Sequence, residues 1–100
     1  MALHRFSPVR ALLPKVLARL SRETGHAVHL RPVWLEIVGA VAARHSTPVA
    51  LEERTLVVEV DSARWAGALE AQGAQIQSRL DERLGEGAVA RVVYRPKTSR

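Results

Sequence analysis

One stretch of this 100-residue chain decides its fold: VALEERTLVVEVDSARWAGAL, residues 49–69. It opens with a short apolar run, continues through the polar turn candidate Glu52–Arg54, and then places apolar residues at alternate positions from Leu56 to Val60. This pattern predicts a β-hairpin, because alternation with a period of two turns one face of a strand toward a core. Asp61 or Ser62 supplies a capping oxygen, so a helix is predicted to follow the hairpin directly.

Two helices are predicted before the hairpin. The first runs from Ser7-Pro8 to Gly25, since serine and proline favour a helix start and glycine favours a helix end. Pro14 lies inside this pattern, so the helix is expected either to kink there or to begin there. The second begins at Pro32 and stops at His45–Pro48, and Gly39 inside it is expected to permit close approach by a neighbouring element. Apolar stripes at helical spacing are expected to face the core: Leu12, Leu13, Val16, Leu17 and Leu20 in the first helix, and Val33, Trp34, Ile37, Val38, Val41 and Ala42 in the second.

The remaining elements complete an α+β pattern. The helix after the hairpin is predicted to be long and to reach Leu84, and a last strand covers residues 89–94 before Pro96 ends it. The order helix, helix, strand, strand, helix, strand favours a two-layer α+β domain, in which helices cover a small three-stranded mixed sheet. We predict one domain over residues 1–96 and a frayed tail at residues 97–100.

Charge is distributed unevenly along the chain, whose net charge is +5. Residues 1–35 carry a net charge of +5, residues 36–87 carry −4, and residues 88–100 carry +4. Basic ends around an acidic middle favour a polyanion on one surface and a protein on another. The candidate nucleic-acid contacts are the basic residues of the first helix and of the last strand and tail: Arg10, Lys15, Arg19, Arg22, Arg91, Arg95, Lys97 and Arg100. The sequence leaves open whether the two groups share one side and form a continuous groove for phosphates.

Groups for catalysis or metal binding are scarce. The chain contains no cysteine, and the motifs of phosphate-binding loops, dinucleotide sites and nucleophile elbows are missing. His26, His29 and His45 lack the carboxylate pattern of a metal site, and the spacing of His45, Asp61 and Ser62 does not support a catalytic triad. We expect the ring of His45 to stabilise the last carbonyl groups of its helix. The sequence thus predicts no enzyme, no metal and no cofactor.

The location expected from composition is the cytoplasm. No apolar stretch approaches the about 20 residues that span a bilayer, so we expect no membrane partner. The absence of cysteine is also typical of an intracellular chain.

The two tryptophans, Trp34 and Trp65, each begin an apolar stripe, so we expect both indoles to pack in the core. The alternative is a partly exposed anchor at a protein interface, where tryptophan is enriched. Base stacking fits less well, because the strands offer Tyr94 alone and not a pair of exposed aromatic residues.

Several short motifs follow one another in a characteristic order between about Leu12 and Tyr94. They are Trp34, Val38-Gly39, Ala42, His45-Ser46, Pro48, Leu56-Val57-Val58, Ser62, Trp65-Ala66, Leu69 and Leu84-Gly85. Over nearly its whole length the chain therefore resembles the bacterial DciA-like family, and the block W…VG…A..H..P followed by S..WA is fairly specific.

That resemblance implies a type II KH-like fold and a role beside the bacterial replicative helicase, which members of the family help to deliver to DNA. It also implies that members bind nucleic acid, and that an architectural role falls to the signature residues Trp34, Gly39, His45, Pro48, Ser62 and Trp65. The Gly-x-x-Gly loop of typical KH domains is absent, so binding would use arginine–phosphate contacts instead. Many members continue into a flexible C-terminal extension. If that extension engages helicase or DNA, we expect this chain to perform only part of the family's task.

The sequence supports three hypotheses about function. The leading one is a non-catalytic DNA-binding adaptor, with basic ends on single- or double-stranded DNA and an acidic or apolar middle on a replicative helicase. The second is an RNA-binding KH-like module unrelated to replication, and the third is a structural oligomerisation domain without nucleic-acid binding. Strand preference, the helicase-facing surface and the oligomeric state stay open.

Overall fold

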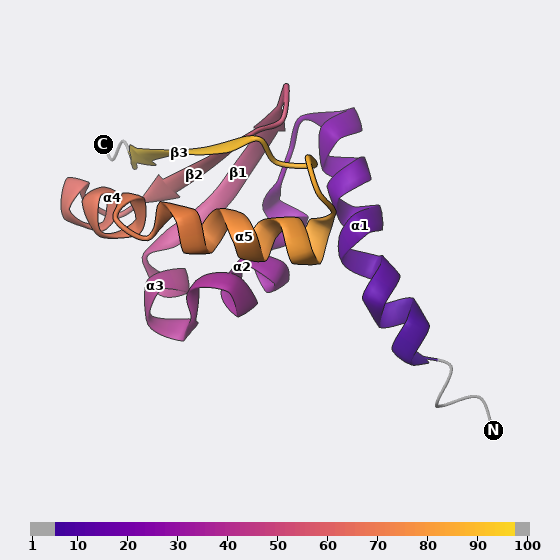
Figure 1. The fold of residues 1–100 in the computed structure, drawn as a ribbon. Coiled ribbons are helices and arrows are strands. Elements are labelled where there is room, and N and C mark those ends of the chain that lie inside the picture. Colours follow the sequence, from indigo (N-terminus) through magenta and orange to yellow (C-terminus); the bar gives the residue numbers. More distant parts are fainter. Residues whose placement is uncertain (1–5, 98–100) are drawn as a thin grey trace.

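The computed structural model describes the backbone of residues 6–97 and the side chains of residues 14–97. Helices cover one face of a three-stranded sheet, which confirms the predicted α+β class (Figure 1). The elements in chain order are α1 (Phe6–Thr24), the 3-10 helix η2 (Val28–Leu30), α2 (Arg31–Val38), α3 (Ala40–Arg44), β1 (Ser46–Glu52), β2 (Thr55–Val60), α4 (Ala63–Glu70), α5 (Gly73–Leu84) and β3 (Arg91–Pro96).

The sheet is mixed and has the strand order β1-β2-β3. β1 and β2 form the predicted antiparallel hairpin, and β3 returns parallel to β2 after the crossover through α4 and α5. Glu53 and Arg54 make the hairpin turn with positive φ values of 50° and 65°, which suit the right-handed twist of the strands. Arg54 also holds the chain that leads into β3, because its carbonyl accepts from Ala90 N–H at 2.6 Å and its Nε donates to the Gly87 carbonyl at 2.9 Å.

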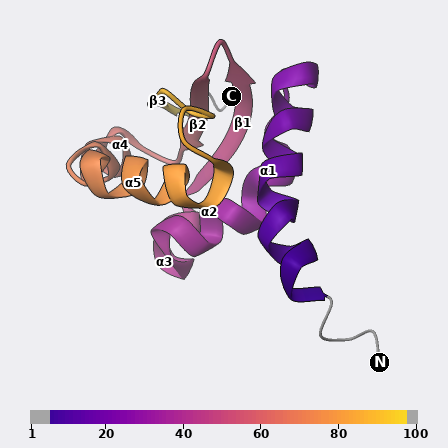
Figure 2. The same ribbon diagram turned by 45° about the vertical axis from the view of Figure 1, so that its right-hand side comes forward.

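The core lies between the inner face of the sheet and the helices. The alternation predicted for β2 is confirmed, since Leu56, Val58 and Val60 are buried while the residues between them are only partly covered. The other face of the sheet carries no helix in the described part of the chain (Figures 1 and 2). The largest fully buried side chains from the helices and strands are Trp34, Leu30, Ile37, Leu51, Leu56, Ile76, Leu80, Val58 and Val60.

The apolar stripe predicted for the first helix is partly wrong. Val16 is 48% exposed and Leu20 is 44% exposed, whereas Ala18 and Ser21 are buried. α1 packs against η2, β1 and α5 through this face of small side chains, which lets the helix approach closely. The side chains of Leu12 and Leu13 lie outside the described residues. The N-terminal half of α1 projects away from the sheet in both views (Figures 1 and 2).

The second predicted helix is broken at Gly39 into α2 and α3. Gly39 has φ 92° and ψ 164°, a conformation that is essentially restricted to glycine. The expectation of close approach at this glycine is wrong, because a β-carbon built there meets nothing within 4 Å. Val41, predicted to continue the stripe, is 57% exposed because the break turns α3 away from the line of α2.

Three further boundaries differ from the prediction. The long helix after the hairpin is two helices, α4 and α5, separated by Ala71 and Gln72. Ser46–Pro48 do not merely stop a helix but form the start of β1, where Pro48 is accommodated beside an irregularity in strand pairing. Val89 is buried yet precedes β3, which begins at Arg91 and includes Pro96.

Candidate functional site

Three cations of α1 share one exposed face, and we call them the α1 cluster. Lys15, Arg19 and Arg22 are all exposed, and spacings of four and three residues bring them to the same side of a helix. Among the described residues, no carboxylate forms an ion pair with any of the three. Arg10 also belongs to α1, but its side chain lies outside the described residues. The positive charge of this face is therefore available to an anionic partner.

The second group of cations, the β3 cluster, consists of Arg91, Arg95 and Lys97. All three are exposed, but the side chains of two of them already contact β2. Arg95 Nη2 lies 3.8 Å from Glu59 Oε2, and Arg91 Nε donates to Thr55 Oγ1 at 3.3 Å. These contacts follow from the parallel register, which places each arginine beside its partner. Arg100 lies outside the described residues.

The two clusters do not adjoin one another. α1 contacts η2 and β1, whereas β3 is the strand on the far side of β2. Figure 2 shows α1 and β3 separated by the hairpin. The described residues therefore present two cationic surfaces at different edges of the sheet, rather than one continuous groove.

Trp34 is the centre of a buried polar chain that joins α2, α3 and β1. The Nε1 of Trp34 donates to Ser46 Oγ at 2.8 Å, and the Ser46 hydroxyl in turn donates to the Ala42 carbonyl at 2.7 Å. Trp34 is only 2% exposed, which confirms the expectation that it packs in the core. The signature block that runs from Trp34 to Ser46 is thus a hydrogen-bonded unit.

His45 and Trp65 form a second contact between signature residues. The His45 ring stacks on the Trp65 ring with centroids 4.7 Å apart and planes inclined by 12°. His45 Nδ1 lies 2.7 Å from Asp61 Oδ2, and Asp61 N–H donates to the His45 carbonyl at 3.0 Å. The prediction that the His45 ring serves the last carbonyls of its helix is therefore wrong. Asp61, at the end of β2, holds the ring instead.

Ser62 begins α4 as predicted, because its Oγ accepts a hydrogen bond from Trp65 N–H at 3.4 Å. Its hydroxyl is therefore engaged as a helix cap rather than directed to His45. Trp65 itself is only partly buried and packs at the margin of the core. Gly39 lies at the break between α2 and α3, and Pro48 is fully buried in β1.

Three side-chain polar atoms in the described part of the chain are buried without a hydrogen-bond partner. They are Ser21 Oγ, His29 Nε2 and the Tyr94 hydroxyl. Burial, with a smaller effect of Glu70, raises the pKa of Tyr94 to about 12. Within residues 14–97, no group of three histidine, aspartate or glutamate side chains could hold a metal ion.

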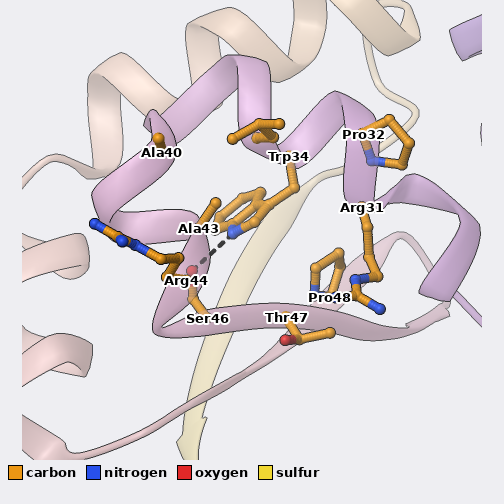
Figure 3. Close-up of a pocket in the computed structure, with 10 residues that line it drawn as sticks. Arg31, Pro32, Trp34, Ala40, Ala43, Arg44, Ser46, Thr47 and Pro48 are labelled. Atoms are coloured by element: carbon orange, nitrogen blue, oxygen red, sulfur yellow. Dashed lines mark hydrogen bonds between the residues drawn. The ribbon is translucent and has the colours of Figure 1, made fainter.

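A groove missed by the sequence analysis lies between α2, α3 and the start of β1. Its volume is about 720 Å³. Figure 3 shows Trp34 in its middle, with Arg31 and Arg44 directed toward opposite ends. The groove exists because Gly39 interrupts the helix, and the glycine inside an apolar helical stripe was the available signal for it.

Fold and surface together define the class of this protein: a small α+β domain that presents separate cationic surfaces and an apolar groove. The chain belongs to the DciA family, because the family model described as Dna[CI] antecedent, DciA, matches residues 8–94. This membership supports a helicase-loader-like role at the level of the family. None of the described helices combines the length and the apolar character needed to cross a membrane.

Similar proteins carry the UPF0232 description. One from Mycobacterium ulcerans is 32% identical over 85 residues, which cover 76% of this chain and 46% of the relative. Another, from Streptomyces coelicolor, is 45% identical over 58 residues, which cover 56% of this chain and 30% of the relative. The chain therefore spans about half the length, or less, of these relatives.

Proposed function

We propose that this domain is a non-catalytic, cytoplasmic adaptor that binds DNA and acts beside the replicative helicase. The observation that carries the DNA-binding part is the α1 cluster, in which Lys15, Arg19 and Arg22 share a face without a described acidic partner. Family membership supports the helicase-related part. The signature residues act as framework in this proposal, since the described contacts hold helices and strands together.

The α1 cluster is the better phosphate surface of the two. From Lys15 to Arg22 the helix rises about 10 Å, a length over which duplex DNA carries about six phosphate charges. Arg95 in the β3 cluster must instead give up a contact with Glu59 to meet a phosphate. That exchange costs little, because an exposed ion pair is worth only about 0–1 kcal/mol. The freed Glu59 carboxylate would nevertheless stay beside Arg95 and repel the phosphate, so the β3 cluster is a secondary contact.

Charge reversal distinguishes the two surfaces. K15E/R19E/R22E and R91E/R95E/K97E change the net charge equally, so each controls for the other. In anisotropy titrations with a labelled oligonucleotide, we expect the α1 variant to lose about tenfold or more in affinity, and the β3 variant to lose less. Equal losses would show that net charge alone matters. An RNA of the same sequence as competitor tests the RNA-binding alternative, which predicts that RNA displaces DNA efficiently.

The helicase-related part has its own test. The domain and the replicative helicase of the same organism are mixed and analysed by size-exclusion chromatography with light scattering. We expect a complex with the wild-type domain and with K15E/R19E/R22E, because the adaptor hypothesis places the helicase on the acidic or apolar middle of the chain and not on the α1 cluster. Absence of a complex with the wild-type domain contradicts this part. A concentration-dependent dimer that binds no oligonucleotide at low salt would instead support the oligomerisation hypothesis.

A further inference from the structure

The groove beside Trp34 has an apolar floor on a rigid support. Pro32, Leu35, Ala40 and Ala43 are among its lining residues, and Leu35 is 46% exposed. A leucine this exposed within a concave surface offers apolar area that a partner can cover. Its volume of about 720 Å³ is large enough for several side chains of a partner.

The support behind the floor is fixed by hydrogen bonds. The Trp34 indole beneath the groove is tied to Ser46. On the other side of α2, Arg79 Nη1 donates to the Ile37 carbonyl at 2.8 Å, and Arg83 pairs with Glu36. The groove is therefore preformed, which lowers the entropic cost of binding.

The charged residues that line the groove are both cations. Arg31 and Arg44 are both exposed and lie toward opposite ends (Figure 3), and no carboxylate belongs to the lining residues. Neither arginine forms an ion pair with any residue of the described chain. Arg31 is the first residue of α2, where the helix dipole disfavours a cation. Helix stability therefore does not account for an arginine at this position, whereas an anionic partner does.

We propose that this groove is a docking surface for a protein partner, which inserts an amphipathic helix whose apolar residues are flanked by carboxylates. This inference rests on the proposed adaptor function and assigns its protein-facing surface. An added strand fits less well, because Pro48 in the groove wall has no backbone N–H to donate. A nucleic acid fits less well, because Trp34 is 2% exposed and its ring face is not available for base stacking.

The test uses a defined probe and the whole chain. The probe is a labelled synthetic helix of leucine, alanine and glutamate, with leucines spaced three and four residues apart and glutamates beside them. The control peptide carries glutamine in place of every glutamate. R31E/R44E tests the groove, and R19E/R22E is the matched variant, because it changes the net charge by the same amount on α1. R31Q/R44Q serves as a second groove variant if the reversal impairs folding.

We expect the glutamate peptide to bind the wild-type chain and R19E/R22E alike, and R31E/R44E about tenfold or more weakly, with R31Q/R44Q in between. We expect the glutamine peptide to bind weakly to all variants. Amide shifts in NMR spectra should concentrate at Ala40, Ala43 and Thr47, which line the groove.

Other results overturn the inference. If the wild-type chain binds the two peptides equally, Arg31 and Arg44 do not recognise carboxylates. If R31E/R44E and R19E/R22E lose equal affinity for the glutamate peptide, net charge alone explains the effect. Loss of oligonucleotide binding in R31E/R44E, with no peptide binding by the wild type, would make the groove a nucleic-acid surface. The proposed DNA contact fails separately, if R19E/R22E keeps wild-type DNA affinity while the peptide results stand.

Discussion

Replacing Ser46 by alanine tests whether the signature block is held together as the structure shows. The Ser46 hydroxyl is buried and takes part in two hydrogen bonds, one from Trp34 Nε1 at 2.8 Å and one to the Ala42 carbonyl at 2.7 Å. Alanine removes both while leaving the strand backbone intact. The Ala42 carbonyl keeps a partner, because it also accepts from His45 N–H at 3.1 Å. The indole N–H loses the only partner it has among the described residues.

The expected cost follows from these contacts. A buried donor left without a partner costs about 1–3 kcal/mol, and the second hydrogen bond contributes about 1 kcal/mol net. We therefore expect S46A to lower the free energy of unfolding by about 2–4 kcal/mol. Urea denaturation followed by tryptophan fluorescence measures this directly, with the midpoint falling and the slope unchanged.

Two controls make the result specific. Ser78 is exposed on α5, and S78A is expected to change the free energy of unfolding by less than about 0.5 kcal/mol. In a double-mutant cycle with W34F, the combined variant should be more stable than the sum of the single losses predicts, with a coupling of about 1 kcal/mol or more. A loss below about 0.5 kcal/mol for S46A, or additive effects in the cycle, would refute the proposed role of the hydroxyl.

Three further predictions concern the fold. G39A should lower the free energy of unfolding by about 1–3 kcal/mol, and the cause is the positive φ of Gly39 alone, because no atom obstructs a β-carbon there. The matched variant G67A, inside α4, should raise the free energy of unfolding by about 0.5–1 kcal/mol in the same urea assay. H45A should cost about 1–2 kcal/mol by removing the stack on Trp65, and H45F should recover part of this. The absorbance of Tyr94, the single tyrosine, should titrate with a midpoint near pH 12. The stability that Tyr94 contributes is fully present below pH 10 and is lost as the pH rises toward 12. An absorbance midpoint near pH 10 would contradict the burial of the Tyr94 hydroxyl.

The hairpin and the class of fold were predictable because they depend on local signals. The alternation from Leu56 to Val60 matches the buried face of β2, and Ser62 caps α4 as its residue type predicts. The helix breaks were not predicted, because a helical stripe continues in sequence whether or not the axis bends. Gly39 was interpreted as a contact point, yet it acts through its backbone conformation.

The packing of α1 and the site geometry were harder to predict. Val16 and Leu20 have the composition of a core stripe, but α1 docks through Ala18 and Ser21, which only the tertiary arrangement decides. The relation of the two cationic clusters depends on which sheet edge each element occupies, and no local pattern encodes that. The bond between His45 and Asp61 joins residues on different elements for the same reason.

The most direct measurement of the DNA-binding proposal is the salt dependence of binding to a short duplex. Each phosphate neutralised contributes about −0.9 to the slope of log K against log salt concentration. Neutralising the α1 cluster with K15Q/R19Q/R22Q should therefore make the slope shallower by about 2.7. A slope that stays at the wild-type value would show that Lys15, Arg19 and Arg22 do not contact DNA.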